Sequence, residues 1–271
     1  MARLYGWSLD AFYGIDHTYV TSSDGHIWNC WGRSSGGQVI CSGEAESEHA
    51  ECLSQRKSHA GLLYGLTGVC HQTANRILFP ARCIVSKATN YWLTAFIYGT
   101  YGLSVEAFQH RINTCLQAPD YLIPRLDSDH TELTYEMIYL QEINKLYAHA
   151  LTMQRQTGIS KKQMILSLLQ DELRLATAYR LGTQASTNVA DTLLKYQSEL
   201  HKAKSFYDRT FLAKRILPVQ YAEKMNELTK AAFKDINKSL GEDSFQEMFG
   251  IIKEVQLIDP GIMQKFYLKN M

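Results

Sequence analysis

The stretch "YGLTGVCHQTANRIL", residues 64–78, decides how this chain is interpreted. A glycine-punctuated approach ends at Cys70, where a helix pattern begins, with Ala74, Ile77 and Leu78 as its buried positions. Backbone N–H groups at a helix start have no intrahelical partner, so they stabilise a thiolate and can bind the oxyanion formed when sulfur attacks a carbonyl. This pattern fits a nucleophilic Cys70 and a small buried cysteine equally well.

A nucleophilic cysteine also needs a base. His71 follows Cys70 directly, but adjacent helix residues point about 100° apart, so the base is expected elsewhere. His17 is preferred among the upstream histidines because it begins a strand directly before a hairpin. A strand-borne imidazole packed on a helix-borne thiol would be held rigidly within hydrogen-bond reach.

A third group should orient that imidazole, and the hairpin register decides which residue it is. A three-residue loop at residues 23–25, "SDG", places Asn29 on the face of His17. A two-residue turn at Asp24 and Gly25 places His26 on that face instead. Asn29 is therefore the first choice, and His26 is the alternative.

This order of residues resembles the circularly permuted branch of the NlpC/P60 papain-like superfamily. A histidine strand and a polar strand precede a cysteine helix with a Tyr–Gly–x–x–Gly approach, and the resemblance covers about residues 5–100. It implies a thioester-forming attack on an amide or ester carbonyl, followed by hydrolysis or transfer to an amine. The substrate would be a peptide, protein or peptidoglycan-type amide, with no cofactor. The residues that it implies are Cys70 as nucleophile, His17 as general base, Asn29 (or His26) as orienting group, and Tyr64 with the Cys70 N–H at the oxyanion.

Composition changes near residue 120. Residues 1–120 hold all four tryptophans, all six cysteines and 12 of the 17 glycines, with 17 charged residues against 38 in the remaining 151. We expect an α+β fold with a papain-like catalytic region over residues 1–118 and a helical accessory region over residues 119–271. The catalytic region combines a small antiparallel sheet with the cysteine-bearing helix.

Local patterns predict the individual elements. Strands are expected at residues 17–22, 26–31, 36–43, 82–86 and 91–99, and a polar helix within 44–61. Further helices are expected at 132–155, 160–181, 187–215, 219–240 and 244–254. Capping boxes at Ser160 and Ser244 predict two of these helix starts, and Gly182 and Gly241 predict two helix ends.

The bulk properties exclude some partners. A formal net charge of +1 gives no electrostatic reason to expect nucleic acid or an anionic membrane. No apolar run reaches transmembrane length, and the start of the chain lacks the layout of a signal peptide. We therefore expect a cytoplasmic or effector-type protein, or one secreted without a cleavable signal peptide. Its cysteines are expected to be thiols kept reduced.

Two other classes of protein compete with the enzyme. A structural zinc site would use Cys41, His49 and Cys52, although tightly spaced cysteine pairs are missing from the sequence. A non-catalytic interaction protein would use the helical region as its docking surface. The preferred reading has neither a metal nor a cofactor, and the thiol enzyme differs from both rivals in needing one unusually reactive cysteine.

Overall fold

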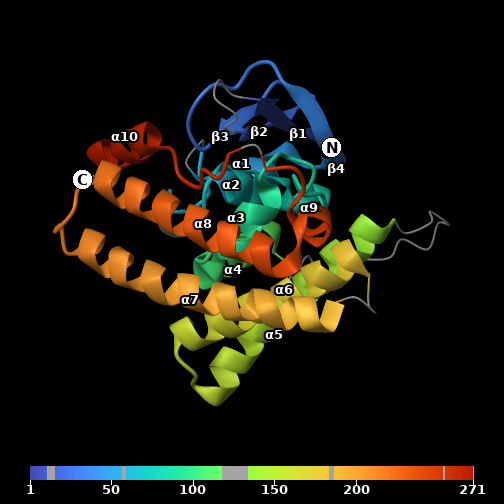
Figure 1. Ribbon diagram of the computed structural model, residues 1–271. Helices are drawn as coiled ribbons and strands as arrows, with labels where there is room; N and C mark the ends of the chain where they lie inside the picture. Colours follow the sequence, from blue (N-terminus) through green and yellow to red (C-terminus); the bar gives the residue numbers. More distant parts are fainter. Residues whose placement is uncertain (11–15, 57–58, 118–133, 183–185, 253, 271) are drawn as a thin grey trace.

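The computed structural model describes residues 1–10, 16–56, 59–117, 134–182, 186–252 and 254–270. The fold is α+β, as predicted, with a four-stranded antiparallel sheet on one side and helices over the rest of the molecule (Figure 1). The elements are β1 (Ala2–Asp10), β2 (Asp16–Ser22), β3 (Ile27–Asn29), β4 (Gln38–Ala45), α1 (Ser47–Ser54), α2 (Cys70–Leu78), η1 (Phe79–Ala81), α3 (Tyr91–Tyr98), α4 (Val105–Leu116), α5 (Tyr135–Thr157), α6 (Lys161–Leu181), α7 (Ser186–Leu212), α8 (Pro218–Leu240), α9 (Glu242–Phe249) and α10 (Pro260–Asn270).

The β2–β3 hairpin has the three-residue loop. Tyr19 lies opposite Asn29, and the Ser22 N–H donates to the His26 carbonyl at 3.0 Å, which closes the loop over residues 23–25. Gly25 has a φ of 95°, a conformation that a side chain would strain. The register that places Asn29 on the face of His17 is therefore confirmed.

The sheet order is β3-β2-β1-β4, and β1, one of the two inner strands, was not predicted from the sequence. Gly6 of β1 lies opposite Val20 of β2 and Cys41 of β4. A Cβ at Gly6 would come within 2.5 Å of the Cys41 Sγ and 3.0 Å of Leu78 on α2. Because opposite residues of antiparallel strands share a face, this contact identifies the face of the sheet that packs on α2.

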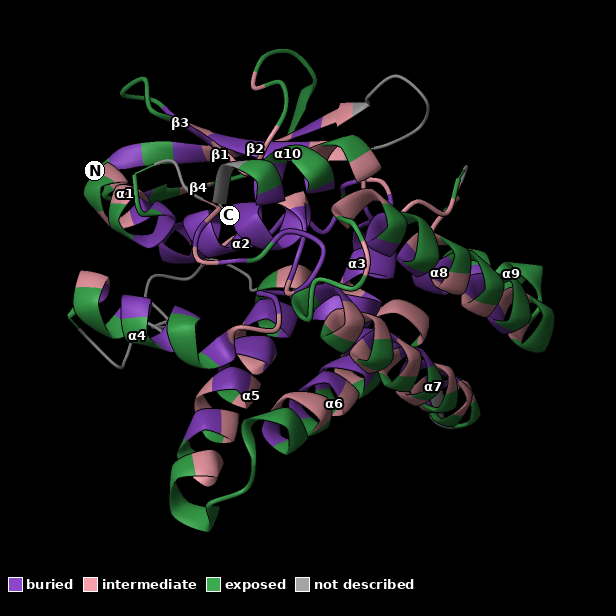
Figure 2. Ribbon diagram, turned by 90° about the vertical axis from the view of Figure 1, so that its left-hand side faces the viewer, coloured by how far each residue is buried: buried purple, intermediate pink, exposed green. Residues whose placement is uncertain are grey.

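Helix α2 is the centre of the molecule and is buried along its length (Figure 2). Its polar residues bind the surrounding loops. The fully buried Arg76 guanidinium donates to the carbonyls of Tyr101 at 2.6 Å, Ala60 at 3.0 Å and Ser104 at 3.1 Å. These bonds satisfy a charge and three carbonyls that would otherwise be buried at a large cost.

Two strand predictions are wrong. Residues 91–98 form the helix α3, and residues 82–86 lie in irregular structure. Helix α3 is buried on nearly every side, so its apolar run carries no helical periodicity. A short continuous apolar run fits a buried strand and a buried helix equally well, and the packing around it decides between them.

Most helices of the second region are confirmed. Ser160 caps α6 through the Gln163 N–H at 3.2 Å, and Gly182 and Gly241 follow the ends of α6 and α8 as predicted. The capping box at Ser244 is wrong, because α9 already begins at Glu242. The sequence analysis also missed α10, and the polar helix expected within 44–61 is limited to α1.

One hydrophobic core joins the sheet side to the helical side. Phe96 of α3 packs edge-on against Phe233 of α8 and Phe249 of α9, with ring centroids 5.6 and 5.9 Å apart. The predicted boundary near residue 118 lies outside the described residues. Among the described helices, none has a stretch that is long and apolar enough to cross a membrane.

The expectation that every cysteine is a thiol is wrong. Cys52 on α1 and Cys115 on α4 form a disulfide with a Cα–Cα distance of 5.8 Å. Cys30, Cys41, Cys70 and Cys83 are thiols. The disulfide brings together two helices that are separated by 63 positions in the chain, and the sequence offered no signal for that pairing.

Candidate functional site

Cys70 is the first residue of α2, as the sequence predicted. Residues 64–69, called the approach loop below, form a tight turn before the helix. The Gly65 N–H donates to the Gly68 carbonyl at 2.8 Å, and Tyr64 forms an isolated β-bridge with Gly68. Gln72 fixes the helix start, since its side-chain oxygen accepts from the Val69 N–H at 3.2 Å. These local hydrogen bonds therefore fix the position of Cys70 at the start of α2.

The Cys70 side chain borders a cavity of about 30 Å³, and this cavity is called the thiol cavity below. Tyr64, His71 and Asn90 contribute to its wall, and the segment before α10 completes it with Gln256, Leu257 and Asp259. The Asp259 N–H donates to the Tyr64 hydroxyl at 3.2 Å. The cavity has room for about one water molecule, so a substrate has to displace the covering segment.

Tyr64 lies beside Cys70 and is 5% exposed. Burial, followed by the nearby Cys70 sulfur, raises the pKa of the Tyr64 phenol well above its ordinary value of 10.0. The phenol therefore stays protonated at neutral pH and keeps a proton to donate. This state is the one that an oxyanion-binding tyrosine requires.

Cys30 is a second cysteine close to Cys70. It is hydrogen-bonded to Thr73 on α2 and interacts electrostatically with Cys70, and burial raises its pKa to about 12. A hydrogen bond to Cys41, with burial, raises the pKa of Cys83 well above 9.0. Cys30 and Cys83 are therefore unreactive thiols near neutral pH, because the thiolate is the nucleophilic form.

His17 and Asn29 come together at a different place. The His17 ring stacks on Tyr19 with centroids 6.3 Å apart, and a Cβ at Gly32 would lie 3.5 Å from the His17 Nε2. Asn29 donates to the Gly32 carbonyl and to the Ser34 hydroxyl, both at 3.1 Å. Both side chains thus meet the loop at residues 32–34.

That loop lies on the sheet face opposite to α2. Val20 shares the face of Gly6 that packs on α2, and strand alternation turns His17 and Tyr19 the other way. The three-residue loop sets the register of β3, so that Asn29 lies on the face of His17. Cys30, the next residue, then points toward α2, where it bonds to Thr73. The structure therefore groups Cys70 with Tyr64, and His17 with Asn29, on two sides of the sheet. His26, the alternative to Asn29, directly follows the hairpin loop, and its Nδ1 lies 3.2 Å from a carboxylate oxygen of Asp24.

His71 is a residue that sequence reasoning set aside. It is 2% exposed, borders the thiol cavity together with Cys70, and its Nδ1 lies 2.9 Å from the Thr94 hydroxyl. A hydroxyl partner fixes the orientation of the ring. The side chains of adjacent residues on an ideal helix point in different directions, which argued against His71. In the folded protein, Cys70 and His71 nevertheless line the same cavity.

The zinc alternative loses one of its ligands, because Cys52 is bonded to Cys115. Within the described ranges, no three histidine, cysteine, aspartate or glutamate side chains are close enough to hold a metal ion.

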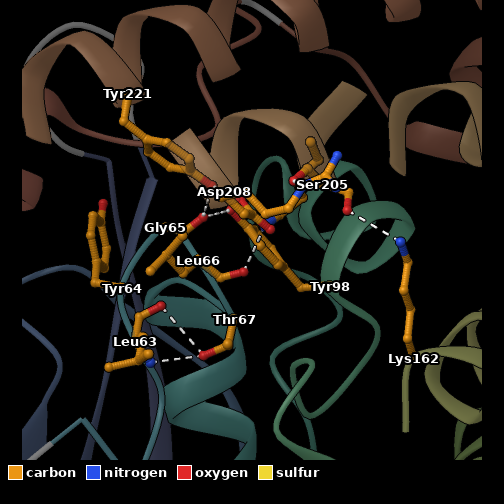
Figure 3. Close-up of polar contacts among 12 residues, drawn as sticks. Leu63, Tyr64, Gly65, Leu66, Thr67, Tyr98, Lys162, Ser205, Asp208 and Tyr221 are labelled. Atoms are coloured by element: carbon orange, nitrogen blue, oxygen red, sulfur yellow. Dashed lines mark hydrogen bonds and ion pairs between the residues drawn. The ribbon is translucent and has the colours of Figure 1, made fainter. Parts of the chain in front are cut away.

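Helices α3, α7 and α8 hold the approach loop to Cys70 in place (Figure 3). Lys204 of α7 donates to the Leu66 carbonyl at 2.8 Å, and the Tyr98 hydroxyl donates to the Gly65 carbonyl at 2.6 Å. Lys204 is also paired with Asp208 at 2.8 Å, and Tyr221 of α8 donates to Asp208 at 2.6 Å. Burial lowers the pKa of Lys204, and Asp208 opposes that effect.

Comparisons with protein-family models, curated proteins and solved structures gave no match to this chain.

Proposed function

We propose that the protein is a cysteine-dependent hydrolase or acyl transferase of the permuted papain-like type. One observation carries the proposal: Cys70 begins a buried helix and shares a cavity with the protonated hydroxyl of Tyr64. A nucleophile and an oxyanion donor are thus held together by backbone structure. The substrate class is an amide in a peptide, a protein or peptidoglycan.

The chemistry would run in two steps. The Cys70 thiolate attacks the amide carbonyl, and the oxyanion accepts hydrogen bonds from the first N–H groups of α2 and from the Tyr64 hydroxyl. Collapse of the intermediate forms a thioester and releases an amine, which takes a proton from the base. Water or a second amine then attacks the thioester and restores the thiol.

The base has two candidates. The sequence pattern favours His17 with Asn29, which the fold places on the far face of the sheet. The thiol cavity favours His71, whose ring is oriented by Thr94.

The Cys52–Cys115 disulfide supports action in an oxidising compartment, because disulfides persist there. It therefore favours a secreted protein over a cytoplasmic one.

The first test is alkylation of the native protein with limiting iodoacetamide over a range of pH, read for each cysteine by peptide mass spectrometry. We expect Cys70 to react fastest, while Cys30 and Cys83 react slowly because their pKa values are raised. Loss of the advantage of Cys70 in His71→Ala, but not in His17→Ala, would identify His71 as the base; the reverse would identify His17. Equal rates for Cys70 and Cys30 in the native protein would refute the enzyme.

A second test uses p-nitrophenyl acetate as a simple acyl donor. We expect a burst of p-nitrophenol from acylation of Cys70, which Cys70→Ala abolishes and Tyr64→Phe slows by about a hundredfold, the usual effect of losing one oxyanion donor. A burst that persists in Cys70→Ala would place the nucleophile elsewhere.

A further inference from the structure

A second and larger cavity lies between α6 and α7, where these helices meet the turn after α3. It has a volume of about 550 Å³ and is called the interhelical pocket below. Leu103, Ile165 and Leu166 form apolar wall, and the side chains of Lys162 and Lys202 lie at its rim, exposed to solvent. This volume is within the range of small-molecule sites, which also tend to lie where parts of a fold meet.

The net charge of the interhelical pocket is positive. Lys204 and Asp208 neutralise each other at 2.8 Å, and burial lowers the pKa of His201 to about 4, so its imidazole is neutral near pH 7. Lys162 and Lys202 therefore supply the uncompensated charge among the residues that line the pocket. Lys162 reaches from α6 to the Ser205 hydroxyl of α7 at 3.3 Å (Figure 3).

An apolar wall beside two cationic rim residues matches a ligand with an apolar body and one anionic end. We propose that the interhelical pocket binds an organic carboxylate with an apolar chain. The chain lies against Leu103, Ile165 and Leu166, and the carboxylate lies between Lys162 and Lys202. The proposal concerns binding alone and is independent of the chemistry at Cys70.

Three probes with one chain and three head groups test the proposal: decanoate, decanol and decyltrimethylammonium. Their binding to the full chain is measured by isothermal titration calorimetry, below the concentrations at which they form micelles. We expect decanoate to bind most tightly and the cation least. Added salt should weaken decanoate binding and leave decanol binding unchanged, because salt screens only the charged contact.

Variants then assign the charge to the rim. Lys162→Gln combined with Lys202→Gln should weaken decanoate binding by about tenfold, from about threefold per exposed ion pair, and leave decanol unaffected. Lys195→Gln, at an exposed position of α7 outside the pocket, is the matched control and should bind like the wild type. Absence of decanoate binding, equal affinity for the three probes, or full decanoate affinity in the double variant would each overturn the proposal.

Discussion

At the scale of single residues, buried ionisable groups connect the helical region to the loops around α2. Glu172 of α6 is 4% exposed and accepts hydrogen bonds from the Thr100 N–H, at 2.6 Å, and from the Thr100 hydroxyl. Burial raises the pKa of this carboxyl from 4.5 to about 7. Between about pH 4.5 and pH 7, Glu172 therefore keeps its proton in the folded protein and loses it in the unfolded chain.

This difference predicts a pH dependence of stability. The folded state binds the Glu172 proton more tightly, so its contribution is complete below about pH 4.5 and is lost as the pH rises to about 7. The free energy of unfolding should fall by about 3 kcal/mol over that window from this group. Denaturant unfolding of wild type and Glu172→Gln at several pH values measures the effect.

Glu172→Gln should remove that slope, because glutamine does not titrate. Glu199→Gln, at an exposed position of α7, is the control and should keep the slope of the wild type. Parallel pH profiles for wild type and Glu172→Gln would show that folding does not raise the pKa of Glu172.

At the scale of elements, the segment before α10 closes the thiol cavity. Asn226 of α8 anchors it: the side-chain oxygen accepts from the N–H groups of Leu257 and Ile258, both at 2.9 Å, and the amide donates to the Ile258 carbonyl at 2.7 Å. The Asn90 amide adds a bond to the Glu254 carbonyl at 3.3 Å. One side chain of α8 thus holds most of the cover in place.

Asn226→Ala should therefore open the thiol cavity. The loss of three hydrogen bonds is expected to lower the free energy of unfolding by about 1–3 kcal/mol and to raise the rate of Cys70 alkylation severalfold. Asn237→Ala, on the same helix but bonded to Glu242, should lower stability without changing the alkylation rate. If Asn226→Ala lowers stability and leaves the alkylation rate of Cys70 unchanged, the segment does not control access to the thiol.

At the scale of the whole molecule, a shared hydrophobic core joins the sheet side to the helical side, and one disulfide links α1 to α4. The Cys52–Cys115 disulfide closes a loop of 63 positions that contains the approach loop, α2 and α3. A loop of this length restricts the unfolded chain strongly. The disulfide therefore stabilises the part of the chain that carries Cys70.

Replacing both cysteines, in Cys52→Ala combined with Cys115→Ala, should lower the free energy of unfolding by about 4 kcal/mol, the chain-entropy value for such a loop. A reductant should destabilise the wild type by a similar amount and leave the double variant unchanged. Thermal unfolding with and without reductant measures both. Recovery of Cys52 and Cys115 as thiols by peptide mapping under non-reducing conditions would contradict the link.

Elements that depend on local signals were predictable from the sequence. The capping box at Ser160, the glycines that end α6 and α8, the hairpin loop at residues 23–25 and the helix start at Cys70 were all predicted. Each depends on backbone hydrogen bonds and conformations within a few residues. These signals also placed Asn29 on the face of His17.

Tertiary structure alone decided three other features: the helical state of residues 91–98, the sheet face that meets α2, and the pairing of Cys52 with Cys115. Each depends on contacts between residues far apart in the chain. A short apolar run forms a helix or a strand depending on the elements that pack around it. The alternation along a strand shows which of its residues share a face, but it does not show which face another element covers. For this reason the sequence paired His17 with Cys70, whereas the fold placed His71 in the same cavity wall as Cys70 and Tyr64.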